Sequence, residues 1–142
     1  MITKLLISFV MMACCVGIHA TGVTSALRMF DRSPALADRR FWRPTWLLVR
    51  VASWLILLHL LEISIWALLY TWGNAMPDAH AAFYFSSVTY TTTGYGDLVL
   101  PEQWRLIGGI EALTGILMCG WSTGFFFTIV SRMHGSRPSK AS

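Results

Sequence analysis

Charged side chains are scarce in this chain. Asp, Glu, Lys and Arg make up 13% of its 142 residues, whereas hydrophobic residues make up 55%. Soluble domains carry about 25% charged residues, so the composition indicates a lipid bilayer rather than water as the main solvent. The length suits a single domain.

Cysteine is also rare, and its placement excludes some chemistry. Cys14, Cys15 and Cys119 lie inside apolar stretches and show no metal-site spacing. We therefore expect all three to pack as small apolar side chains. No motif places a histidine beside a serine or threonine as a catalytic base, so we do not predict an enzyme.

Basic residues are few outside two clusters. One cluster falls within residues 28–50 and the other in the tail, and their members are Arg28, Arg32, Arg39, Arg40, Arg43 and Arg50, then Arg132, Arg137 and Lys140. Such clusters are typical of cytoplasmic flanks that contact anionic lipid, and we predict no nucleic-acid partner. A voltage sensor is excluded because the arginines do not recur at every third position of an apolar helix.

Three apolar runs are long enough to cross a membrane, namely residues 5–27, 47–72 and 106–130. About 20 helical residues span about 30 Å of hydrocarbon. Residues 79–91 are too few to cross, so we predict a re-entrant pore helix with Asp78 as its N-cap. The predicted fold class is an all-α membrane protein with three transmembrane helices plus this pore helix.

The same patterns divide the chain into four parts. We expect an N-terminal transmembrane helix at 1–27, a basic cytoplasmic loop at 28–46, a pore module at 47–133 and a disordered cytoplasmic tail at 134–142. Aromatic side chains suit the membrane–water interface, and we expect Tyr70 and Trp72 there.

Residues 91–97 read Thr-Thr-Thr-Gly-Tyr-Gly-Asp and carry the most specific chemistry. They resemble the selectivity filter of a potassium channel, in which backbone carbonyls replace the hydration shell of K⁺. Successive carbonyls can face one axis only if the backbone alternates in conformation, and glycine reaches positive φ without a Cβ clash. We therefore expect K⁺ ligands from Thr92, Thr93, Gly94 and Tyr95, positive φ at Gly94 and Gly96, and a further oxygen from the Thr92 hydroxyl.

Residues 47–133 as a whole resemble the two-helix pore module of potassium channels, particularly the small prokaryotic ion-channel proteins. The resemblance depends on residues 83–97, on Pro101 and on Trp104-Arg105. It implies a homotetramer in the cell membrane (the prokaryotic inner or plasma membrane), in which three identical subunits complete the pore and K⁺ passes in single file. The chain has one pore segment and no internal repeat, which agrees with assembly from four copies.

The filter surroundings depart from the family pattern in two places. Many relatives carry a Trp pair where this chain has Tyr84-Phe85. The Tyr84 hydroxyl can donate to Asp97 instead, but Phe85 has no polar atom to support Tyr95. We therefore expect the side chains of Tyr84, Thr89 and Asp97 to support the filter. Thr93 replaces the common valine and leaves the carbonyl unchanged.

The first apolar run admits two interpretations. Residues 1–20 resemble a secretory signal that ends in a small-residue cleavage site at Ile18-His19-Ala20. Cleavage would place the arginines outside and the filter inside, against the positive-inside rule. We expect the helix to be retained with its N-terminus outside, and Lys4 is a minor exception to that rule.

Several residues of the membrane segments are candidates for gating. Gly115 and Gly120 suit either a hinge in the last helix or close helix packing. Glu111 is expected to bond Ser86 or Thr89 behind the filter, as a pH-sensitive brace or as a permanent structural contact.

His59 and Glu62 share a face of the second long helix. We expect them to pair with each other or with His19, either to fix helix register or to sense protons. The ligand types also allow a metal site on paper, but no known spacing motif supports it.

We therefore predict a K⁺-selective channel that conducts passively. Two alternatives stay open. One is a non-selective cation channel, because Phe85 removes one support of the filter. The other is a non-conducting sensor or assembly subunit that keeps a relict filter.

Overall fold

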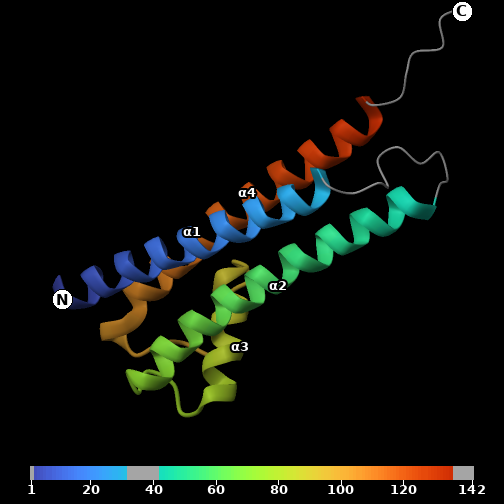
Figure 1. The fold of residues 1–142 in the computed structure, drawn as a ribbon. Helices are drawn as coiled ribbons and strands as arrows, with labels where there is room; N and C mark the ends of the chain where they lie inside the picture. Colours follow the sequence, from blue (N-terminus) through green and yellow to red (C-terminus); the bar gives the residue numbers. More distant parts are fainter. Residues whose placement is uncertain (1, 32–41, 136–142) are drawn as a thin grey trace, which may run out of the picture.

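A computed structural model describes residues 2–31 and 42–135 of the chain, and within them helices are the only regular secondary structure (Figure 1). The elements in order are α1 (Ile2–Asp31), α2 (Trp42–Trp72), α3 (Ala79–Tyr90), the short 3₁₀ helix η2 (Glu102–Trp104) and α4 (Arg105–Gly135). Three helices are long and apolar enough to cross a membrane, over Ile2–Met29, Thr45–Trp72 and Glu102–Met133. The predicted all-α membrane fold is confirmed.

All three long helices are longer than the apolar pattern predicts, and α4 continues to Gly135, into the range 134–142 that we expected to be a disordered tail. α1 continues to Asp31 and α2 begins at Trp42, so these two helices extend into the range 28–46 that we expected to be loop. Hydropathy marks only where a helix leaves hydrocarbon, and helical hydrogen bonding can continue into water. Pro44 is compatible with α2 because the first turn of a helix needs no partner for that backbone nitrogen. The predicted lipid contacts at Arg32, Arg39 and Arg40, and the tail from residue 136, lie outside the described residues.

The three long helices run alongside one another, with α1 beside α4 and α2 antiparallel to both (Figure 1). The short helix α3 packs between α2 and α4 at one end of the bundle. The N-terminus lies at that same end, where Lys4 Nζ sits 4.2 Å from the centre of the Trp104 ring and 3.4 Å from the Gln103 carbonyl oxygen. The basic ends of α1 and α2 therefore lie far from α3.

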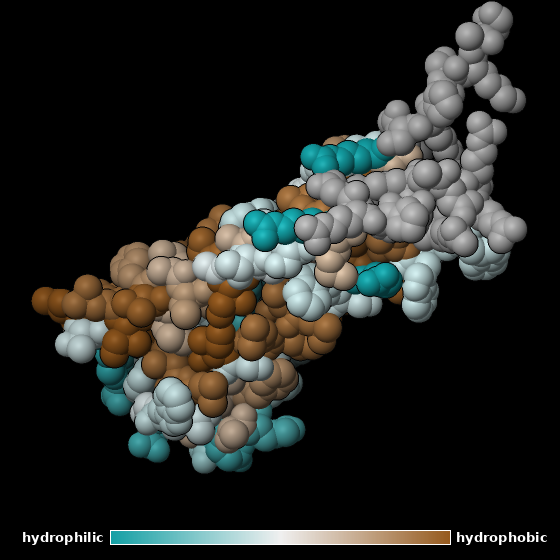
Figure 2. Space-filling model, viewed as in Figure 1, coloured by the Kyte–Doolittle hydropathy of each residue, from teal (hydrophilic) through white to brown (hydrophobic). Residues whose placement is uncertain are grey.

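Hydrophobic side chains cover the middle of the molecule, and hydrophilic side chains gather towards its two ends (Figure 2). Beneath this belt, one apolar cluster around Trp66 and Met118 packs near α3, and another around Leu58 and Ile129 packs near the basic end. Exposed leucines and isoleucines on all three long helices suit contact with lipid or with partner subunits.

The predicted pore helix is confirmed, with its cap. The Asp78 carboxylate accepts a 2.7 Å hydrogen bond from the Ala81 amide, one of the donors that a helix start leaves unpaired. The helix ends at Tyr90, and the chain then turns into the glycine-rich segment. Its partly negative C-terminus is therefore directed towards that segment.

Candidate functional site

The segment after α3 is tied to the last turn of that helix. The Thr92 amide donates to the Thr89 carbonyl over 2.9 Å, and the Thr93 amide donates to the Val88 carbonyl over 2.9 Å. The Gly94 amide reaches the same Val88 oxygen over 3.3 Å. These bonds fix the position of the extended segment Thr92–Gly96, called the filter strand or simply the strand below, relative to the pore helix.

Every second residue of the strand has positive φ. The angles are +59° at Thr92, +54° at Gly94 and +78° at Gly96. The prediction for the two glycines is confirmed. Thr92 was not predicted, because a β-branched residue at positive φ is an outlier. The strict alternation is nevertheless what a carbonyl-lined strand requires, and that regularity is the signal that could have pointed to Thr92.

The strand lies on the surface of the single chain. Residues 91–99 are all exposed, and the Tyr95 side chain is 72% exposed. A cavity of about 120 Å³ lies between the strand and α3. Its lining includes Phe85, Thr89 and Gly96. Thr89 therefore lies behind the strand that it was predicted to support.

Tyr84 and Asp97 form the predicted hydrogen bond at the Gly96 end of the strand. The Tyr84 hydroxyl donates a 2.7 Å hydrogen bond to Asp97 Oδ2. This bond is the main reason that the pKa of Asp97 lies below, and the pKa of Tyr84 above, its ordinary value. Phe85 instead packs edge-on against Tyr70, with ring centroids 5.4 Å apart.

Glu111 is fully buried and accepts two hydrogen bonds. The Ser86 hydroxyl, one of the two predicted partners, donates to Oε1, and the Tyr70 hydroxyl donates to Oε2 over 2.7 Å. The sequence did not predict this contact of Tyr70, which is 0% exposed and reaches inward to the carboxyl group. Its neighbour Trp72 is exposed.

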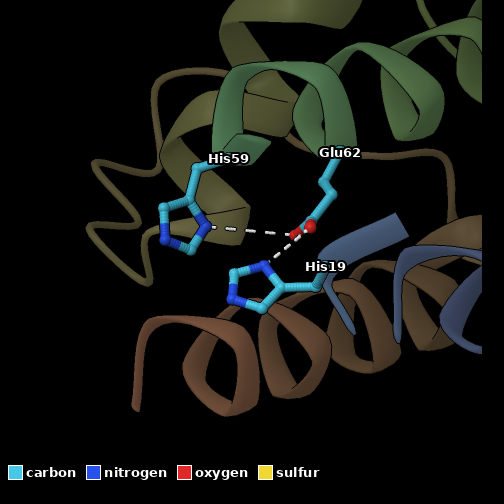
Figure 3. A group of neighbouring side chains, drawn as sticks. All are labelled: His19, His59 and Glu62. Atoms are coloured by element: carbon cyan, nitrogen blue, oxygen red, sulfur yellow. Dashed lines mark hydrogen bonds and ion pairs between the residues drawn. The ribbon is translucent and has the colours of Figure 1, made fainter. Parts of the chain in front are cut away.

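The predicted pairing of His59, Glu62 and His19 is present, and His19 is the closer partner (Figure 3). His19 Nδ1 lies 2.9 Å from Glu62 Oε1, and His59 Nδ1 lies 3.9 Å from Glu62 Oε2. One ligand atom from each of the three residues falls within 4.8 Å of the others, and zinc accepts these ligand types. Sequence reasoning missed two further members of this cluster, Tyr90 and Ser122, which hydrogen-bond His59.

The two hinge candidates on α4 differ in their surroundings. A Cβ on Gly115 would overlap the backbone carbonyl group of Tyr90 at the end of α3, so this glycine permits close helix packing. A Cβ on Gly120 would meet no atom of the chain within 4 Å. Packing therefore accounts for Gly115 and leaves Gly120 without a role in the single chain.

The cysteines are only partly as expected. Cys15 is buried in the apolar core and Cys119 is half-buried against it. Cys14 is exposed on the single chain, so the prediction of a packed position is wrong there. Neighbouring helix positions face different directions, and the apolar run did not reveal which one faces inward.

A model of the ion channel family matches residues 51–132. The match covers more than half of the chain and includes α3, the alternating strand, nearly all of α4 and the part of α2 from residue 51 onwards. It leaves out α1, and with it His19. No curated protein and no solved structure matches the chain.

Proposed function

Because the chain belongs to the ion channel family, we propose that it forms a channel selective for K⁺ that conducts passively across the cell membrane. The observation that carries the proposal is the alternation of positive φ at Thr92, Gly94 and Gly96 within a Thr-Thr-Gly-Tyr-Gly strand. Such a backbone suits carbonyl oxygens that take the place of water around a bare cation.

In this proposal K⁺ is the cargo, and the main chain supplies its ligands. Carbonyls of Thr92, Thr93, Gly94 and Tyr95 coordinate the ion, and Gly96 lets the strand turn away at its outer end. Asp97 adds negative charge at the outer mouth, held in place by Tyr84. The negative end of the α3 dipole favours a cation at the inner end of the strand.

The proposed assembly is a homotetramer. One chain offers a single exposed strand, and a row of carbonyls on one side cannot surround an ion. Four strands around one axis give each ion a cage of oxygens. The three membrane-crossing helices make the chain a multi-pass membrane protein. We place it in the prokaryotic inner or plasma membrane, with anionic lipid near the basic residues of 28–50.

A specific observation favours a second candidate, a non-selective cation channel. The cavity of about 120 Å³ behind the strand is lined in part by Phe85, which offers no hydrogen bond to Tyr95. A strand with space behind it can widen and admit hydrated Na⁺. The proposal of K⁺ selectivity therefore requires Tyr84, Asp97 and the Val88 carbonyl to hold the strand without that bond.

Reversal potentials in planar bilayers test the proposal. With K⁺ on one side and Na⁺ on the other, the current through purified full-length protein should reverse far towards the K⁺ equilibrium potential. That potential moves by about 59 mV for each tenfold change in K⁺ concentration. A reversal potential near zero would instead indicate a non-selective pore, and the absence of current would indicate a non-conducting assembly subunit.

A further inference from the structure

Five side chains from all four α-helices close a ring of hydrogen bonds beneath the filter strand. The members of this polar ring are His19 of α1, His59 and Glu62 of α2, Tyr90 of α3 and Ser122 of α4. His19, Glu62, Tyr90 and Ser122 are buried and His59 is half-buried. Figure 3 shows Glu62 with the two histidines, His19 and His59, that face its carboxyl group.

The ring closes in five contacts. Glu62 Oε1 lies 2.9 Å from His19 Nδ1, and His19 Nε2 lies 3.1 Å from Ser122 Oγ. Ser122 Oγ lies 3.0 Å from His59 Nε2, and His59 Nδ1 lies 3.2 Å from the Tyr90 hydroxyl. Tyr90 donates its own proton to Glu62 Oε2. Every ring nitrogen and both carboxyl oxygens thus have a partner without a metal ion.

The five contacts need more protons than the side chains carry when both histidines are neutral and Glu62 is ionised. Five hydrogen bonds require five protons. Tyr90, Ser122 and two neutral histidines bring one each, and an ionised Glu62 brings none. With only four protons, two lone pairs would face each other somewhere in the ring.

The missing proton can be located by following the donors. Because Tyr90 donates to Glu62, the Tyr90 oxygen must accept from His59 Nδ1. His59 Nε2 then accepts from Ser122, and Ser122 accepts from His19 Nε2. His19 Nδ1 is left without a proton against Glu62 Oε1, so the fifth proton belongs between these two atoms.

The net charge of the polar ring also favours five protons. With five protons the polar ring is electrically neutral, and with four it carries one buried negative charge. Among the described residues, the other titratable groups close to Glu62 are the thiols of Cys15 on α1 and Cys119 on α4, and neither carries positive charge to compensate it. His59 on α2 and Tyr90 on α3 also lie close to Glu62, and both are ring members. An uncompensated charge at membrane depth is costly.

We propose that the polar ring is a proton-binding site, which holds a fifth proton between His19 and Glu62 in the folded protein. The site joins α1, which lies outside the ion channel match, to the last residue of the pore helix. Its occupant is a single proton for each chain. The proposal does not depend on conduction, because it concerns proton uptake on folding.

The sign of the pH dependence follows from linkage. At mildly alkaline pH the unfolded chain leaves these groups with four protons, because its histidines are neutral and its glutamate is ionised. The folded ring holds five, so folding takes up one proton and stability falls as pH rises. The unfolding equilibrium constant should increase tenfold for each pH unit in each subunit on account of this site.

The substitution Glu62→Gln keeps the ring of hydrogen bonds but removes its need for a fifth proton. The glutamine amide donates to His19 Nδ1 and its oxygen accepts from Tyr90, so the ring closes with no added proton. We expect unfolding of the full-length protein in detergent, measured from about pH 8 to 9, to lose this tenfold dependence in the variant. Ser64→Ala on the same helix, which only removes a bond to the Leu60 carbonyl, should keep the parent profile. Parallel profiles for parent and Glu62→Gln would overturn the proposal.

A second measurement needs no variant. In the unaltered protein at about pH 8, ¹⁵N and ¹³C spectra should show the extra proton, either as a charged His19 ring or as a protonated Glu62 carboxyl group. Neutral ring histidines together with an ionised Glu62 would overturn the proposal. So would one divalent metal ion per subunit in the purified protein, because a metal would take the place of the ring protons.

Discussion

Gly94→Ala is expected to abolish K⁺ flux into liposomes that contain the purified protein. Gly94 has φ of +54°, where an L side chain costs about 1–2 kcal/mol. In the proposed tetramer this cost falls on four strands that must order together, so the population of ordered filters drops by well over tenfold. Uptake of tracer K⁺ by the liposomes measures the loss directly.

The matched control is Gly17→Ala on α1. Gly17 lies inside a helix, and an added Cβ would meet no atom within 4 Å. Alanine is the better helix former, so flux and stability should stay at the parent level or stability should rise slightly. Equal flux through Gly94→Ala and Gly17→Ala would show that the strand around Gly94 is not the filter.

Gly115→Ala should destabilise the folded protein. Its Cβ would overlap the Tyr90 backbone carbonyl and come within 3.0 Å of Tyr90 Cγ. Backbone cannot yield as a flexible side chain does, so α4 and α3 must separate. Overpacking of this kind costs about 1–3 kcal/mol in each subunit. Thermal unfolding in detergent should show a clearly lower midpoint, and flux should fall with it because Tyr90 leads directly into the filter strand.

Gly120→Ala is the comparison that separates packing from hinge motion. Gly120 has open space around its Cα in the single chain, so alanine there should leave the unfolding midpoint near that of the parent. If Gly115→Ala unfolds like the parent and only its open probability changes, the packing explanation is wrong and Gly115 acts as a hinge.

The sequence predicts most of what depends on neighbours along the chain. The spans follow from hydropathy, the Asp78 cap from its place before a short helix, and positive φ at Gly94 and Gly96 from their missing Cβ. The Tyr84–Asp97 bond was predictable because the family pattern places a donor at that position.

Contacts between helices were much harder to predict. The bond from Tyr70 to Glu111 was not expected, and neither Tyr90 nor Ser122 was expected beside His59. Such contacts depend on how each helix is rotated about its axis. A uniformly apolar membrane helix gives little sign of that rotation, because its lipid-facing and buried sides have similar composition.

The pore is the claim on which the rest of the function depends, and a cryo-microscopy structure of the full-length assembly in K⁺ tests it most directly. We expect four chains around one axis, with the strands of Thr92–Gly96 facing each other and a single row of cation densities between them. A monomer or dimer, or strands turned towards lipid with no ions between them, would contradict the account.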